Sequence, residues 1–106
     1  MTMSNKLKDD YLDYLFEGIL TLETVDDCYN FFEDLCTVSE LQEMSRRIVA
    51  ARMLKDNYIY TEIAAKTGLS TATISRVNRC LKYGTDGYLS VLDKIERKRK
   101  RSNDAK

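Results

Sequence analysis

The sequence predicts an all-helical fold, and three observations lead to that expectation. Apolar residues recur every three or four positions over most of the 106 residues, and no alternating run typical of a strand stands clear. The chain contains no proline, so nothing forces a helix to break. Capping residues and glycines separate the periodic segments into six helices.

The first half of the chain predicts three helices. Residues 6–20 carry an apolar stripe at helical spacing, made of Leu7, Tyr11, Tyr14, Leu15 and Ile19. Thr24 with Asp27 three residues later resembles a capping box, and a second stripe follows it to Cys36. Ser39 with Gln42 also fits the capping box, and it opens a longer helix that ends near residues 56–57.

The second half predicts two short helices separated by a tight turn. A short helix fits Thr61–Thr67, and Gly68 ends it. Ser70 can then cap the next helix, which covers Thr71–Tyr83 and ends before Gly84.

The last segment predicts one more helix followed by a basic tail. An apolar stripe begins at Tyr88 and gives way to RKRKR at 97–101. Like charges in a row oppose helix formation, so we expect the helix to end before this run. No linker or internal repeat divides the chain, and we therefore expect a single domain over residues 1–106.

A net charge of zero hides a split between the two halves. Residues 1–43 carry eleven acidic and two basic side chains, a net charge of −9. Residues 44–106 carry six acidic and fifteen basic side chains, a net charge of +9. This asymmetry indicates that the second half meets a polyanion, and that the two halves attract each other. Solvated faces of ordinary helices are the alternative explanation.

The composition also excludes several function classes. Histidine is absent, which removes the usual proton shuttle and the commonest zinc ligand. The three cysteines at 28, 36 and 80 lack CxxC spacing, so we expect buried thiols instead of a disulfide scaffold or zinc site. No apolar run approaches the roughly 20 residues of a membrane helix. We expect a cytoplasmic protein that is not an enzyme and binds neither a metal nor a membrane.

Two short helices joined around a glycine are typical of a helix-turn-helix. The first helix needs a small residue where the second packs over it, and Ala64 is there. The turn needs a residue that tolerates positive φ, which Gly68 supplies. Apolar residues at the correct offsets complete the predicted core, which comprises Ile63, Ala64, Gly68, Leu69, Ile74 and Val77. The alternative is a helical hairpin in a bundle that binds no nucleic acid.

The second of these helices leaves short polar residues and cations outward. No acidic residue occurs between Glu62 and Asp86, as a surface that faces phosphates requires. Short side chains at the front of the helix allow close approach to base edges. We expect bases and nearby phosphates to be contacted by Thr71, Ala72, Thr73, Ser75 and Arg76, and phosphates by Lys66, Arg79 and Lys82.

At this point the residues resemble a known family. The stretch TEIAAKTGLSTATISRVNRCLK at 61–82 is similar to the DNA-binding unit of the Trp repressor superfamily, and ATISR at 72–76 is its most specific part. The upstream helix with Arg47-Ile48-Val49 resembles the helix that precedes the two DNA-binding helices in that family. The acidic, tyrosine-rich start and the basic end look most like the TrpR-related branch of YerC/YecD type. The resemblance spans about residues 35–95.

The resemblance implies a six-helix fold and an intertwined homodimer with two projecting reading heads. It divides the chain into dimerisation helices at 1–57, a helix-turn-helix at 58–84, a C-terminal helix at 85–96 and a basic tail at 97–106. It also implies a tryptophan site, in which two arginines sandwich the indole and a glycine follows one of them. Arg76 matches one arginine, but Val77 replaces the glycine and Ser45 stands at the second arginine position. We therefore predict that tryptophan is not the corepressor, and that either another ligand or none is used.

The aromatic residues of the first half independently predict a dimer. They are too many for one helix face, and two of them, Phe16 and Phe31, fall off the main stripes and would be exposed without a partner. The full set is Tyr11, Tyr14, Phe16, Tyr29, Phe31 and Phe32. A tightly packed monomer is the alternative.

The sequence-based hypothesis is a homodimeric, sequence-specific DNA-binding regulator, expected to repress transcription from a near-palindromic operator in double-stranded DNA. The basic tail could add phosphate contacts or only fray in solvent. The rival function is a helical protein-interaction module, or adaptor, without specific DNA binding. An RNA binder is a second rival, although the reading head lacks the exposed aromatic platform that single-stranded bases need.

Overall fold

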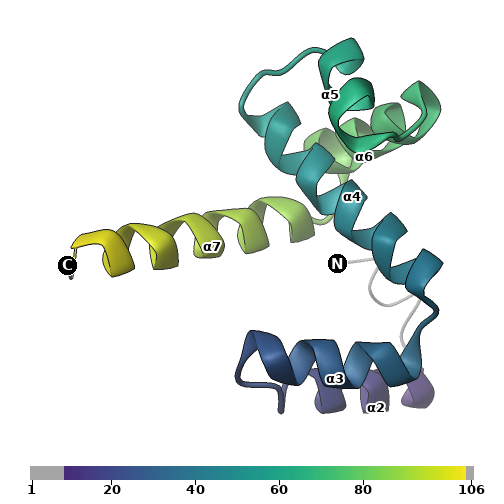
Figure 1. The fold of residues 1–106 in the computed structure, drawn as a ribbon, viewed down its shortest axis with the longest axis vertical. Coiled ribbons are helices and arrows are strands. Elements are labelled where there is room, and N and C mark those ends of the chain that lie inside the picture. Colours follow the sequence, from purple (N-terminus) through teal and green to yellow (C-terminus); the bar gives the residue numbers. More distant parts are fainter. Residues whose placement is uncertain (1–8, 105–106) are drawn as a thin grey trace. The chain divides into compact units, whose positions relative to one another are not determined.

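The computed structural model describes residues 9–104, and all regular elements within them are helices (Figure 1). The six helices are α2 Asp10–Ile19, α3 Val25–Leu35, α4 Val38–Lys55, α5 Tyr60–Thr67, α6 Thr71–Tyr83 and α7 Gly87–Asp104. This confirms the all-α, six-helix prediction, except that the expected first turn at residues 6–8 lies outside the described range. None of these helices combines the length and apolar character that a bilayer-spanning helix needs. The chain divides into two compact units after Gln42.

The first unit contains α2 and α3, each capped by an acidic or hydroxyl side chain. The Asp9 carboxylate accepts from the backbone N–H of Leu12 at 2.7 Å and so caps α2. The predicted capping box at the start of α3 is confirmed. The Asp27 amide donates to Thr24 Oγ1 at 3.0 Å, and the Thr24 amide donates to Asp27 Oδ2 at 3.2 Å. Neither helix contains a fully buried residue.

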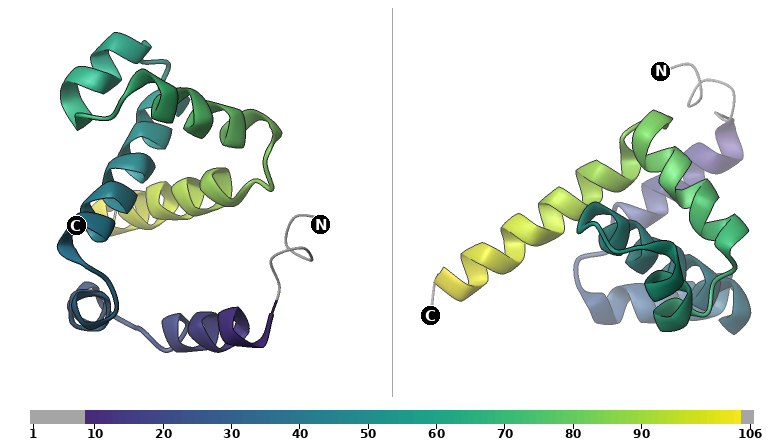
Figure 2. Two further views of the ribbon diagram at one scale, coloured as in Figure 1. Left: turned by 90° about the vertical axis from the view of Figure 1, so that its right-hand side faces the viewer. Right: turned by 90° about the horizontal axis from the view of Figure 1, so that it is seen from above.

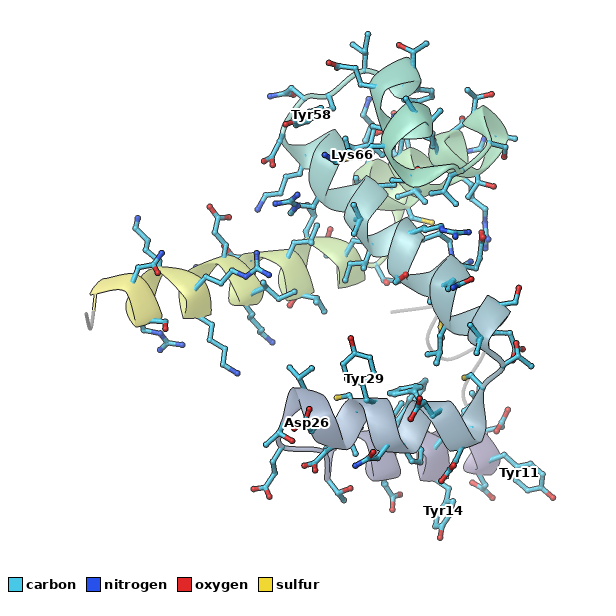
Figure 3. The ribbon with its side chains drawn as sticks, in the orientation of Figure 1. Tyr11, Tyr14, Asp26, Tyr29, Tyr58 and Lys66 are labelled. Atoms are coloured by element: carbon cyan, nitrogen blue, oxygen red, sulfur yellow. The ribbon has the colours of Figure 1, made fainter. Side chains whose placement is uncertain are left out.

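The aromatic side chains of the first unit are largely exposed. Tyr11 is 90% exposed and Tyr14 is 79% exposed, and Figure 3 shows both projecting away from α2. Phe16 is half-exposed, as expected. Phe31 departs from the expectation: its ring lies edge-on to Phe32 with centroids 5.2 Å apart, and both side chains are half-buried. One aromatic pair therefore packs within the unit, while the tyrosines remain uncovered.

The start of α4 differs from the predicted one. The prediction paired Ser39 with Gln42, but the helix begins at Val38 and places Ser39 inside its first turn. The capping box is formed by Thr37 and Glu40: the Glu40 amide donates to Thr37 Oγ1 at 3.1 Å, and the Thr37 amide donates to Glu40 Oε1 at 2.8 Å. A carboxylate also interacts favourably with the helix dipole at this position, whereas the Gln42 amide would not.

The second unit is held together by two small apolar clusters that share α4. One cluster joins Ala50 and Met53 of α4 to Ile63 of α5, Leu69 of the turn and Ile74 of α6. The other joins Ala51 of α4 to Val77 of α6 and Leu92 of α7. Consecutive alanines on α4 therefore serve different clusters. This arrangement fixes α5, α6 and α7 on one supporting helix, and α7 folds back across α4 after the turn that follows α6 (Figure 2).

The last helix corrects the expectation that residues 97–101 end it. α7 continues through the basic run to Asp104. Lys and Arg are strong helix formers, and no glycine or proline interrupts the run. Arg97 pairs with Asp93 one turn earlier at 3.1 Å, and cations near a helix C-terminus are favoured by its dipole. These effects outweigh the repulsion between neighbouring cations.

The cysteines are free thiols, as expected, but they are not buried. Cys28 and Cys80 are exposed and Cys36 is half-buried. Cys28 and Cys80 lie on outward positions of α3 and α6, outside both apolar clusters. They therefore add little to the core.

Candidate nucleic-acid interface

The turn between α5 and α6 is built from three consecutive residues, Thr67, Gly68 and Leu69. Gly68 adopts φ +77° in the left-handed region, and its amide donates to the Ala64 carbonyl at 2.9 Å. The buried Thr67 hydroxyl donates to the Ile63 carbonyl at 2.7 Å and accepts from the Leu69 amide at 3.2 Å. No buried side-chain nitrogen or oxygen of this turn is left without a hydrogen bond. Sequence reasoning missed Thr67, whose role depends on the shape of the turn.

The inner faces of α5 and α6 are buried against α4. Ile63 and Ile74 are fully buried, and Val77 and Leu69 are nearly so. Ala64 is partly buried and packs against the first cluster. The two helices therefore form a closely packed helix-turn-helix, and their outward faces are left to solvent.

The outward face of α6 carries most of the residues that we expect to meet DNA. Six of the eight predicted contact residues lie on α6 with exposed side chains: Thr71, Ala72, Ser75, Arg76, Arg79 and Lys82. Lys66, a seventh exposed residue, lies on α5 just before the turn (Figure 3). The six residues of α6 point outward because the helical repeat turns Ile74 and Val77 inward. One short helix therefore presents polar and basic groups together.

Thr73 differs from the other predicted contact residues. It is half-buried, its amide donates to Ser70 Oγ at 3.1 Å, and its hydroxyl oxygen accepts from the Ser70 hydroxyl at 3.0 Å. Ser70 therefore caps α6 as predicted. The Thr73 side chain is held at the helix start, and its own O–H still has a proton to donate.

The cations of this face have no acidic partners. Within residues 9–104 the two ion pairs are Lys55 with Glu96 at 3.5 Å and Arg97 with Asp93 at 3.1 Å. Arg76, Arg79 and Lys82 take part in neither. Because no acidic side chain among the described residues pairs with them, the surface of α6 is electropositive and complementary to phosphate.

Beneath α6 lies a small hollow that brings two arginines together. Arg47 of α4 and Arg76 of α6 both line it, and its volume is about 90 Å³. The other lining residues are Thr73, Val77, Cys80 and Tyr88. This space is well below the roughly 300–1,000 Å³ of ordinary ligand pockets. Val77 is only 2% exposed and packs into the second cluster, so its side chain fills space that a glycine would leave open.

No group of three or more Cys, Asp or Glu side chains in the described part of the chain is arranged to hold a metal ion. The candidate site thus consists of hydroxyls, methyl groups and cations on one helix face. Such groups contact base edges and phosphates without performing covalent chemistry.

Comparison with known proteins gives consistent matches over most of the chain. A family model described as Trp repressor protein matches residues 10–96. The chain is 49% identical over 92 residues to the uncharacterized protein YerC of Bacillus subtilis strain 168, a match that covers 87% of this chain and 88% of YerC.

Two solved structures match the fold at similar identity. The crystal structure of a TrpR-like protein from Eubacterium eligens ATCC 27750 gives a TM-score of 0.83 at 50% identity, over 87% of this chain and 95% of that one. A candidate Trp repressor from Staphylococcus aureus also gives a TM-score of 0.83, at 49% identity, over 88% and 93% of the two chains.

Proposed function

Because the chain belongs to the Trp repressor family, a family of non-enzymatic regulators, we propose that it is a sequence-specific DNA-binding repressor of transcription in a bacterial cytoplasm. The observation that carries the proposal is the outer face of α6. That face is electropositive, unpaired within the described residues and free of acidic groups, and the buried inner face fixes it on α4.

In this proposal α6 enters the major groove and α5 lies across the DNA backbone. Thr71, Ala72 and Ser75 are short enough to bring the helix close to base edges, and Arg76 is long enough to reach guanine or a phosphate. Thr73 contributes its remaining hydroxyl proton. Lys66, Arg79 and Lys82 contact phosphates and set the register of the helix.

The repressor acts as a homodimer in this proposal. Supporting evidence comes from the first unit, where large apolar side chains remain uncovered. The most exposed are Tyr11, Leu20, Tyr14, Val25, Val38 and Tyr29. A soluble chain rarely leaves so much apolar surface to water, and a second copy would cover it. A two-fold dimer would place two α6 helices about 34–36 Å apart, in successive major grooves of a near-palindromic operator.

Tryptophan is not the corepressor in this proposal. The buried Val77 and the hollow of about 90 Å³ support this, because an indole ring needs space where the valine packs. Calorimetric titration of the protein with tryptophan should show no binding at micromolar concentrations. Micromolar affinity would overturn this part of the proposal.

A salt series separates the proposed repressor from the adaptor alternative. We expect binding to a labelled duplex of mixed sequence to weaken log-linearly with salt concentration, because each phosphate contact releases counterions. An adaptor that recognises only proteins would show no duplex binding at any salt concentration. The absence of duplex binding by the folded protein would therefore contradict the proposal.

A further inference from the structure

The C-terminal half of α7 carries a basic stripe that the helix-turn-helix does not use. Lys94, Arg97, Lys100 and Arg101 line one shallow hollow along the helix, and we refer to these four residues as the outer stripe. Their spacing of three or four residues brings them onto one side of the helix. At a rise of about 1.5 Å per residue, the stripe extends for about 10 Å.

Another cation of the same run faces a different way. Arg99 lines a separate groove between α4 and α7, together with Arg52, Lys55 and Ile95. Leu92, in the second apolar cluster, lines the same groove. α7 therefore has an inner side, which packs on α4, and an outer side, which carries the stripe. Within residues 43–104 no other helix covers the last turns of α7 (Figure 2).

The outer stripe has almost no internal counter-charge. Arg97 is paired with Asp93, but the Arg97 side chain is 74% exposed, and an exposed pair of this kind is readily exchanged. Lys94, Lys100 and Arg101 form no ion pair within residues 9–104. Like charges three or four residues apart destabilise a helix. A polyanion laid along the stripe would remove this repulsion.

We propose that the outer stripe is a second DNA-binding surface, which contacts the phosphate backbone of the duplex without reading its sequence. This inference rests on the proposed function, because it takes the duplex bound by α6 as the ligand. A strand of duplex DNA advances about 3.4 Å per phosphate, so 10 Å of helix corresponds to about three phosphates. Exposed Lys and Arg on a regular helix provide charge and reach, but no pattern that distinguishes bases.

Duplex DNA is favoured over an acidic protein partner by the second unit itself. The stripe belongs to the same compact unit as α6, and Val77 and Leu92 join α6 to α7 in one cluster. α7 therefore has a fixed position relative to α6. The hollow along the stripe is lined by these four cations and by none of the apolar side chains that a protein interface would use as anchors.

The test compares salt slopes for duplex binding. The stripe variant combines Lys94→Gln, Arg97→Gln, Lys100→Gln and Arg101→Gln, which remove charge but keep good helix formers. With a labelled duplex of mixed sequence, we expect the slope of log affinity against log salt to become shallower by about 0.9 for each lost phosphate contact, up to about 2.7 per protomer for three phosphates. The stripe variant should keep the sequence preference of the wild type, because α6 is unaltered in it.

A pair of single variants supplies the matched control. Arg99→Gln and Arg101→Gln make the same chemical change two residues apart on one helix. Only Arg101→Gln should reduce the salt slope, by about 0.9, because Arg99 lies in the groove beside α4. The single variants also decide the question if the combined variant does not fold, which circular dichroism would show.

The other outcomes are distinguishable. If the stripe variant kept the wild-type slope, the inference would be wrong and the proposed function would stand. If the wild type bound no duplex, both would fail. If the variant lost binding to polyglutamate but retained its slope on DNA, the stripe would serve an acidic protein, and the DNA-binding inference would be overturned.

Discussion

Gly68 is the residue on which the angle between α5 and α6 depends most directly. Its φ of +77° lies where residues with a Cβ are strained, and no atom beyond the adjacent residues lies within 4 Å of the position that a Cβ would take. A side chain at this position would therefore cost conformational free energy of the backbone, but it would meet no steric clash. The helical repeat was sufficient to predict Ile63, Ile74 and Val77 as inward residues. It could not predict that Thr67 pairs across the turn or that Arg47 lies beside Arg76, because both depend on three-dimensional packing.

We expect Gly68→Ala to lower the free energy of unfolding by about 1–2 kcal/mol, because the left-handed conformation is unfavourable for alanine. Gly68→Asn should cost less, since asparagine tolerates this region. Urea denaturation of the three proteins measures the difference. Equal stability of the alanine variant and the wild type would show that the turn is not constrained in this way.

Replacement of Arg76 should separate base reading from phosphate contact. Arg76→Ala should cost about 1–3 kcal/mol of binding free energy on the preferred sequence and relax the preference at one position, if the guanidinium reads a base. Lys66→Ala should weaken binding about equally on all sequences. Competition assays with matched and mismatched duplexes measure both effects. A uniform loss in the Arg76 variant would reassign this residue to the backbone.

At the scale of elements, helix ends were predictable where one signal stood alone. Ser70 and Gly84 bracket α6, and its bounds follow them. The start of α4 lies two residues before the predicted one, because Thr37 and Glu40 form the capping box in place of Ser39 and Gln42. α7 is longer than predicted, because the helix propensity of Lys and Arg outweighs the repulsion within the basic run.

The two capping boxes predict a specific acid response. The backbone N–H groups of Glu23 and Thr24 lower the pKa of Asp27 from its ordinary 3.8, and the backbone N–H of Thr37 lowers the pKa of Glu40 from 4.5. Because each pKa is lower in the folded state, each box stabilises the fold above those ordinary values. That contribution disappears as the pH falls through the lowered pKa.

Carboxyl-carbon NMR titration tests this directly. Both carboxyl groups should titrate below their ordinary values in the wild type. In a Thr37→Ala variant the pKa of Glu40 should rise, because a hydrogen bond from the threonine side chain also lowers it, while the pKa of Asp27 stays unchanged. An unaltered Glu40 midpoint would show that the capping box does not hold in solution.

At the scale of the whole molecule, the fold class followed from periodicity, but the quaternary state does not follow from one chain. Apolar side chains of the first unit are exposed, and Tyr11 is 90% exposed. This exposure is the reason to expect a partner. Regularly spaced apolar residues are consistent with a core inside one chain or with an interface between two chains. Sequence reasoning alone therefore left the monomer open.

We expect sedimentation equilibrium to give twice the 12.3 kDa mass of the chain. Combined Tyr11→Ser and Tyr14→Ser substitutions should weaken the dimer, because they remove exposed apolar area from the first unit. Tyr83→Ser is the matched control. Tyr83 is similarly exposed, at 83%, but it lies at the end of α6. A wild-type monomer at all concentrations would contradict the dimer.

The central claim, that this chain is a dimeric reader of DNA sequence, is tested most directly by selection from a pool of random duplexes. We expect enrichment of a near-palindrome whose half-sites lie about one helical turn, roughly 34–36 Å, apart. Enrichment of a single unpaired half-site would contradict the dimeric arrangement. No enrichment by a folded protein would contradict sequence-specific recognition by α6.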